Sequence, residues 1–159
     1  MDITSRLEFP AAPADVFALL VNRDFLIDVC RAGGATAHDV RVEGQRTISQ
    51  RTLPAPDMAK TFTGPTISIT EDITWGEAKA DGGRVGDLVL TVDGQPARMT
   101  GTVTLAPNGG GSTITVNGDL KVSIPLVGKK LEKSAAPAIY DGIKVQQDVG
   151  IRWLTGERA

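Results

Sequence analysis

Aromatic residues are scarce in this chain of 159 residues, which contains four Phe, two Trp and one Tyr. Cysteine is scarcer, because Cys30 is the only one and no disulfide can form within the chain. This favours a reducing compartment, and the cytoplasm is the default expectation. The chain has one cysteine and one histidine, His38, and no closely spaced acidic residues that would complete a set of metal ligands. These residues do not make a zinc or iron centre. We therefore expect no metal and no cofactor.

Net charge is also small, since 17 Lys and Arg residues face 19 Asp and Glu residues for a formal charge of −2. No dense basic stripe with interleaved aromatic residues is present, which argues against a nucleic-acid partner. The longest apolar runs, such as residues 16–21, are far shorter than the roughly 20 residues needed to cross a bilayer. The first six residues lack the basic-then-apolar order of a secretory signal. We expect a cytoplasmic protein without stable membrane insertion.

Apolar and charged fractions of 41% and 23% are ordinary for a globular protein, and the length suits one domain over residues 1–159.

Residues 2–9 alternate between apolar and polar side chains, which predicts a half-buried strand. Pro13 then suits the first turn of a short helix, and Asn22 is a plausible N-cap for a second helix that Gly33 and Gly34 would end.

Six further strands are predicted between residues 35 and 124, separated by turns rich in Gly, Asp and Asn. They cover residues 37–43, 46–53, 66–76, 84–92, 97–105 and 112–124, with a loop over about 54–63. Tight turns in series predict an antiparallel meander. Together with the first strand they give a seven-stranded sheet, in which Gly76, Gly86, Gly101 and Gly118 are candidates for bulges or bends.

The pattern becomes helical after Pro125, and residues 126–154 predict one helix of roughly 40 Å with an expected kink at Pro137. Its apolar face carries eight residues. They are Leu131, Ala135, Ala138, Ile139, Gly142, Gln146, Val149 and Trp153. The elements together predict an α+β fold made of a strand, two short helices, six antiparallel strands and a long C-terminal helix.

This order of elements resembles the helix-grip superfamily, which includes START-like proteins, polyketide cyclases and plant ligand carriers of the Bet v 1 type (SRPBCC). Residues 9–20, FPAAPADVFALL, are similar to the opening motif of that superfamily, and residues 124–133, IPLVGKKLEK, resemble the helix entry of a mostly uncharacterised bacterial branch. The resemblance covers essentially the whole chain. It implies a curved sheet that grips the long helix around a cavity for a lipid, sterol, polyketide or hormone, but neither motif carries catalytic residues.

Three small residues on the helix face, Ala135, Ala138 and Gly142, have two interpretations. Either they let the sheet approach the helix closely, or they leave space for a ligand. The shortage of aromatic rings favours incomplete filling of the interior. Gln146 lies on the same face, and a buried amide there needs a hydrogen-bond partner, which is either a local group, solvent or a ligand.

Glu71 is the most unusual position in the predicted sheet, because the alternation places it on one face with Ile67, Ile69, Ile73 and Trp75. If it faces the interior, Glu71 either pairs with a cation such as Arg98 or has its pKa raised by desolvation and acts as a proton acceptor or ligand anchor. Alternatively, a shift of register turns Glu71 outward.

Other residues with reactive side chains have plainer interpretations. His38 stands beside Asp39 in a charged run and is expected to be a solvated surface group, while Cys30 is expected to be a small buried hydrophobe. The glycine-rich stretch 108–111 joins two strands and is a hairpin turn, because it lacks the helix N-terminus that a phosphate loop requires. Trp75 and Trp153 are either cavity walls or ordinary core anchors.

The candidate ligand-binding set collects these positions with one further residue on the sheet, Met99. It comprises Glu71, Trp75, Met99, Leu131, Ala135, Ala138, Gly142, Gln146 and Trp153.

The leading hypothesis is a protein that carries, sequesters or senses a small hydrophobic molecule without chemistry of its own. The alternative is an enzyme of the cyclase or dehydratase type, in which Glu71, with Arg98 or Gln146, handles a proton. A third hypothesis is a structural protein with a filled core that acts through a homodimer surface.

Overall fold

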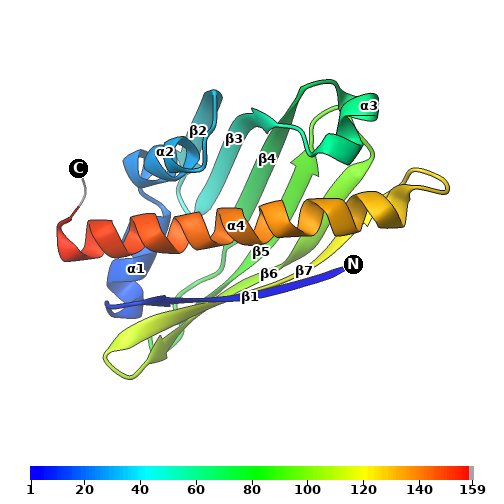
Figure 1. Cartoon of the computed structure of the whole chain (residues 1–159). Coiled ribbons are helices and arrows are strands. Elements are labelled where there is room, and N and C mark those ends of the chain that lie inside the picture. The colour runs from blue at the N-terminus through cyan, green and yellow to red at the C-terminus, as the bar shows by residue number, and fades with distance from the viewer. Residues whose placement is uncertain (158–159) are drawn as a thin grey trace.

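In the computed structural model, which describes residues 1–157, a seven-stranded sheet curves around one long helix (Figure 1). The elements in chain order are β1 (Asp2–Phe9), α1 (Pro13–Leu20), α2 (Arg23–Ala32), β2 (Ala37–Glu43), β3 (Arg46–Pro54), the 3-10 turn η1 (Asp57–Ala59), α3 (Lys60–Thr63), β4 (Thr66–Trp75), β5 (Arg84–Val92), β6 (Ala97–Asn108), β7 (Gly111–Val122) and α4 (Gly128–Thr155). The predicted α+β helix-grip fold is confirmed.

The strands are ordered β1-β7-β6-β5-β4-β3-β2, and all paired neighbours are antiparallel. β2 to β7 therefore form the predicted meander, and β1 joins it at the β7 edge. Of the candidates for bulges or bends, Gly86, Gly101 and Gly118 form no bulge in the described strands, because pairing runs through them without a change of register. Gly86 and Gly118 make room for neighbouring side chains. A Cβ at Gly86 would lie 3.0 Å from the Trp75 ring, and one at Gly118 would lie 2.9 Å from Met99 Cγ.

Local signals set the starts and ends of the N-terminal helices. Asn22 caps α2, because its side-chain oxygen accepts hydrogen bonds from the backbone N–H groups of Asp24 (2.9 Å) and Phe25 (3.3 Å). α2 ends before Gly33, as the sequence predicts. The segment 57–63 differs from the predicted loop and forms η1 and α3, which together are too short to show helical periodicity in the sequence.

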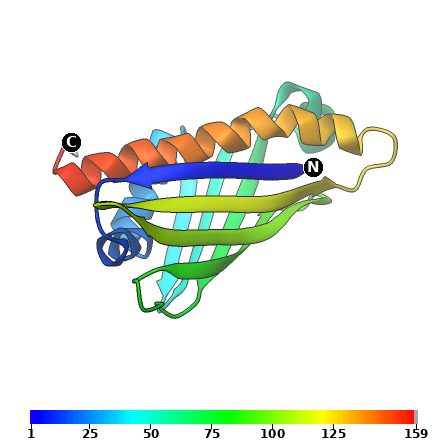
Figure 2. The same cartoon turned by 90° about the horizontal axis from the view of Figure 1, so that it is seen from below.

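α4 crosses the concave face of the sheet and continues through Pro137 as one helix of 28 residues (Figure 2). It also covers the free edge of β1. The Tyr140 hydroxyl accepts a hydrogen bond from the Thr4 N–H at 3.4 Å, and the Gln147 side chain accepts one from the Glu8 N–H at 2.8 Å. These contacts use edge groups that could otherwise pair with another strand. Within residues 1–157, no helix is both long and apolar enough to cross a membrane.

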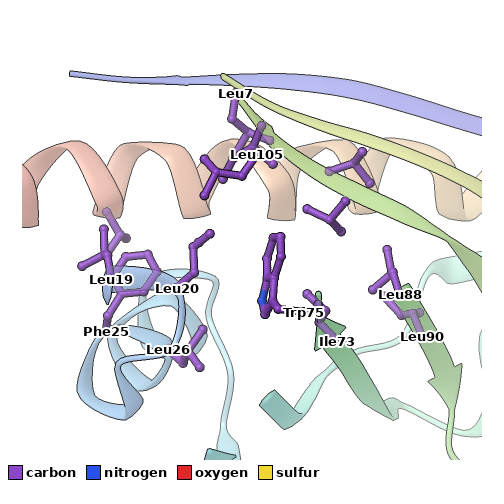
Figure 3. Packing of buried hydrophobic residues seen from close by; sticks show 14 of the residues in the cluster. Leu7, Leu19, Leu20, Phe25, Leu26, Ile73, Trp75, Leu88, Leu90 and Leu105 are labelled. Atoms are coloured by element: carbon purple, nitrogen blue, oxygen red, sulfur yellow. The ribbon is translucent and has the colours of Figure 1, made fainter. Parts of the chain in front are cut away.

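The apolar core lies between the concave face, α4 and the two N-terminal helices (Figure 3). Aliphatic side chains from β1, β5 and β6 meet it from the sheet, and α1 and α2 contribute from one end. Two edge-to-face ring pairs join the helices to the rest of this core. Phe17 of α1 meets Trp75 at 5.9 Å between ring centroids, and Phe25 of α2 meets Trp153 of α4 at 5.8 Å.

Glu132 ties the first turns of α4 to β7 and is expected to make stability depend on pH. Its carboxylate accepts the Val122 N–H at 3.1 Å, which holds the pKa of Glu132 below its usual value against the opposing effect of burial. Because the pKa of Glu132 is lower in the folded state than in the unfolded state, its carboxylate stabilises the fold at a pH above the unfolded-state pKa. This contribution is lost as the pH falls through the folded-state pKa. Urea unfolding of wild type and Glu132→Gln should therefore differ at pH 7 and converge in acid. A difference that stays constant from pH 7 into acid would contradict this role.

Candidate ligand-binding site

One edge of the apolar face of α4 is open in the middle of the helix, where Ile139 still packs against the core, although both ends of the helix are packed. Leu131 and Val149 lie on one stripe of the helix and are buried. Ala138 and Gly142 lie between them on the same stripe and are exposed. A Cβ built on Gly142 would meet no atom of the described residues within 4 Å. Close packing is therefore the wrong interpretation of this glycine, and we call Ala138 and Gly142 the open stretch of α4.

A small apolar pocket lies next to the open stretch, toward the beginning of α4. Its volume is about 80 Å³. Its lining includes the predicted residues Leu131 and Ala135 together with Phe62, Ile67 and Ile124. Because sites for drug-sized ligands measure roughly 300–1,000 Å³, the pocket by itself would hold only one end of a lipid-sized molecule. A larger hollow of about 400 Å³ has polar walls that include Gln50 and Asp93, and contains none of the predicted site residues.

Glu71 faces the interior of the molecule. Its partners across the sheet are Ser49 on β3 and Leu90 on β5, both buried, and Ile73 and Trp75 on the same face of β4 are buried as well. The alternative that turns Glu71 outward is therefore wrong. The register explains why, since it remains continuous along the whole of β4.

The cation that pairs with Glu71 is Arg51 of β3. Arg51 Nη2 donates a hydrogen bond to Glu71 Oε2 at 3.3 Å, and the two side chains are 19% and 22% exposed. The suggested partner Arg98 is wrong, because Arg98 pairs with Thr91 and alternates with buried Met99, which places it on the opposite face. Arg51 stands opposite Ile69, so its guanidinium reaches Glu71 diagonally across the β3–β4 ladder.

Cys30 of α2 completes a charged cluster with Arg51 and Glu71. The thiol is buried, and this burial raises the pKa of Cys30, while the neighbouring Arg51 guanidinium acts in the opposite direction. Cys30 is thus a buried residue as expected, although it does have a cation beside it. His38 stands opposite Arg51 in the β2–β3 ladder and is exposed. We call Cys30, Arg51 and Glu71 the charged cluster.

The inner face of β3 is polar over its whole middle section, unlike the inner faces of the strands that follow it. Thr47 and Ser49 are buried there and precede Arg51 at intervals of two residues. Leu88 and Leu90 on β5, by contrast, give an apolar surface on the same side of the sheet. The concave face therefore combines an apolar floor with one polar border, which is the composition of a site that orients an amphipathic molecule.

Trp75 contributes to this face a polar group for which the described residues offer no partner. The residue is 3% exposed, and its ring lies against Gly86 and Phe17. Within residues 1–157 its indole N–H has no hydrogen-bond acceptor. A buried donor without an acceptor costs about 1–3 kcal/mol. Trp75 follows Glu71 by four residues on one face of β4, so the N–H and the charged cluster are roughly 13 Å apart along the strand.

The other predicted site residues are distributed along α4 and the floor. Met99 is buried on the floor between Leu90 and Leu120. Trp153 donates its indole N–H to Asp28 at 3.0 Å and thereby fastens the end of α4 to α2. Gln146 is half-buried, whereas its neighbour Gln147 makes the hydrogen bond to the sheet edge.

Sequence reasoning missed Arg51, although a signal for it exists in β3. The alternation that places Thr47 and Ser49 on the inner face also places Arg51 there. What the alternation does not give is the pairing with β4. The chain passes through η1 and α3 between these strands, so no short hairpin sets their register.

Comparison with known proteins gives matches over nearly the whole chain. A family model described as "Protein of unknown function (DUF2505)" matches residues 4–154. An uncharacterized protein of Mycobacterium tuberculosis, Rv0481c, is 24% identical over 131 residues, which are 81% of this chain and 75% of that protein.

Solved structures share the fold. TTHA0849 from Thermus thermophilus superposes with a TM-score of 0.68 at 18% identity, over 99% of this chain and all of that one. A STAR-related lipid transfer protein from Xanthomonas axonopodis gives a TM-score of 0.61 at 17% identity, over 92% of this chain and 84% of that one. At these identities the likeness concerns the fold alone.

Proposed function

The chain belongs to the DUF2505 family, and we propose that it binds a small, mostly apolar molecule between α4 and the concave face of its sheet. The apolar body of the ligand lies along the floor formed by β4 to β6 and reaches the small pocket beside Leu131 and Ala135. Its polar group meets the charged cluster or the Trp75 N–H. The name of the Xanthomonas axonopodis relative, which shares the fold, describes a lipid transfer protein and supports this class of ligand.

The observation that carries the proposal is the open stretch of α4. A helix that only completes a core contacts the sheet along its whole apolar stripe, since each unfilled volume forfeits contacts between side chains. Here the stripe is buried at Leu131 and Val149 and exposed between them at Ala138 and Gly142. Ile139, on the neighbouring edge of the same face, is half-buried and packs against the core, so only part of the face is open. A ligand that occupies this space would supply the missing contacts.

The charged cluster supports the same proposal from the side of the sheet. Arg51 and Glu71 are each about one-fifth exposed, so a ligand lying on the floor can reach them without unfolding any element. A guanidinium has five N–H donors, and the described residues engage it through Glu71 and Cys30. A hydroxyl, carbonyl or carboxylate oxygen on the ligand would find donors both here and at Trp75.

Replacing Trp75 by phenylalanine tests whether the indole N–H serves a ligand. Trp75→Phe removes an unsatisfied donor and keeps an aromatic ring, so the free energy of unfolding should change by less than about 1.5 kcal/mol. Affinity for an apolar probe that carries an acceptor should fall about fivefold to tenfold, because one hydrogen bond of roughly 1 kcal/mol is lost. The probe is 1-anilinonaphthalene-8-sulfonate, and its emission on titration with protein is the measurement.

Trp153→Phe is the matched control, because Trp153 already donates its N–H to Asp28. This variant should lose about 1.5–3 kcal/mol of stability, the usual contribution of a hydrogen bond to a charged acceptor. Equal losses of stability in the two variants, together with unchanged probe affinity in Trp75→Phe, would remove Trp75 from the proposed site.

A further inference from the structure

One end of the molecule exposes apolar side chains next to lysines. The loop before α4 and the segment formed by η1 and α3 lie at this end, far from the end of α4 that contacts α2 (Figures 1 and 2). The two segments meet, because Phe62 from α3 and Ile124 from the loop line the same small pocket. We call this end the basic tip. Its exposed apolar residues are Met58, Phe62 and Leu126.

Leu126 is the most unusual of these residues. Its relative exposure is 101%, and its backbone has φ of 72°, in the left-handed region that side chains with a Cβ disfavour. Within residues 1–157 it is the only residue other than glycine with positive φ. A leucine held fully in water on a strained backbone gains nothing in the isolated protein. An apolar partner outside the chain would give it a role.

The charge around Leu126 is strongly positive, although the whole chain is slightly acidic. Residues 120–134 contain four lysines, at 121, 129, 130 and 133, and all four are exposed. The one acidic residue in this range, Glu132, is buried and accepts the Val122 N–H. In η1, the exposed Asp57 pairs with Lys60, which leaves the four lysines as a net positive charge. The basic tip therefore presents a net positive surface around an apolar centre.

We propose that the basic tip docks reversibly on an anionic lipid bilayer. Leu126, Met58 and Phe62 enter the boundary between headgroups and acyl chains, and the lysines face the phosphates of the lipid headgroups. Charge complementarity selects this partner, because a basic rim around exposed aliphatic and aromatic side chains matches an anionic surface over an apolar interior. Docking of this kind goes beyond the proposed ligand binding and stands without it. If both hold, the pocket lined by Phe62 and Leu131 lies at the membrane-facing end.

Sedimentation with lipid vesicles tests the docking. The full chain should sediment with vesicles of phosphatidylcholine and phosphatidylglycerol in equal parts, much less with phosphatidylcholine alone, and less with the mixed vesicles at high salt. The double variant Lys129→Gln/Lys130→Gln should bind mixed vesicles at least about tenfold more weakly, since each lysine near an anionic surface contributes about fivefold.

Leu126→Asn tests the apolar part of the tip without harming the fold, because asparagine tolerates positive φ better than leucine. It should weaken binding to the mixed vesicles by about tenfold or more and leave thermal stability unchanged or higher. Val85→Ser and Lys144→Gln are the matched controls for an exposed apolar residue and an exposed lysine outside the tip, and neither should change binding.

Equal binding to both kinds of vesicle, or binding that Leu126→Asn leaves intact, would overturn the proposal. Absence of binding to either vesicle would overturn it as well. In that case, a dimer in solution that Leu126→Asn dissociates would assign the tip to self-association instead.

Discussion

An Arg51→Met variant is expected to lose about 2–3 kcal/mol of folding free energy at neutral pH. Removing the guanidinium leaves the Glu71 carboxylate on the concave face, where its cross-strand neighbours are Ser49 and Leu90. Removing one partner of a fully buried ion pair costs about 3–5 kcal/mol. Because both side chains are about one-fifth exposed, the loss should fall at or below the lower end of that range.

Two comparisons separate this effect from a general effect of losing an arginine. The double variant Arg51→Met/Glu71→Gln should recover most of the lost stability, because no unpaired charge remains. Arg46→Met removes an arginine from the ion pair with Asp72, whose side chains are 47% and 29% exposed, and should cost less than about 1 kcal/mol. Urea unfolding of the four proteins measures all of these values. Equal losses for Arg51→Met and Arg46→Met, or no recovery in the double variant, would refute the special position of Arg51.

Filling the open stretch of α4 should separate ligand binding from stability. The Cβ of a leucine at position 142 would meet no atom of the described residues within 4 Å. The leucine also replaces glycine, which has the poorest helix propensity after proline. Gly142→Leu should therefore be as stable as wild type or more stable by up to about 1 kcal/mol. Its affinity for 1-anilinonaphthalene-8-sulfonate should nevertheless fall by about tenfold or more, because the new side chain occupies the volume assigned to the ligand.

Gly150→Ala is the matched control on the packed part of the same helix. A Cβ at Gly150 would lie 2.5 Å from Cε1 of the buried Phe9 ring, which cannot move aside easily. This smaller substitution should therefore destabilise the fold by about 1–3 kcal/mol despite its gain in helix propensity. A Gly142→Leu protein that unfolds like Gly150→Ala, or one that binds the probe as wild type does, would show that the open stretch is not a binding volume.

The fold could be predicted from the sequence because its signals are local. Strict alternation and turn glycines give bounds for β1, β2 and β5 that coincide with the structure, and the Asn22 cap and Gly33 define α2. η1 and α3 lack such signals, since seven residues after Pro56 hold less than two helical turns. Gly86 and Gly118, two of the candidates for bulges or bends, make room for neighbouring side chains, and which atoms approach them depends on neighbouring strands.

The candidate site was less predictable because it depends on contacts between distant segments. Alternation alone places Glu71 on the inner face. Finding Arg51 as its partner requires the register between β3 and β4. The small residues at 138 and 142 of α4 are visible in the sequence, but whether the helix packs or stands clear there depends on how its two ends contact other elements.

Native mass spectrometry of the protein purified from the cells that make it naturally tests the central claim most directly. Wild type should carry a small apolar molecule and show a mass above that of the chain. Gly142→Leu, prepared in the same way and equally folded, should show the mass of the chain alone. Bare chains in both preparations, or the same bound molecule in both, would contradict a ligand site between α4 and the concave face of the sheet.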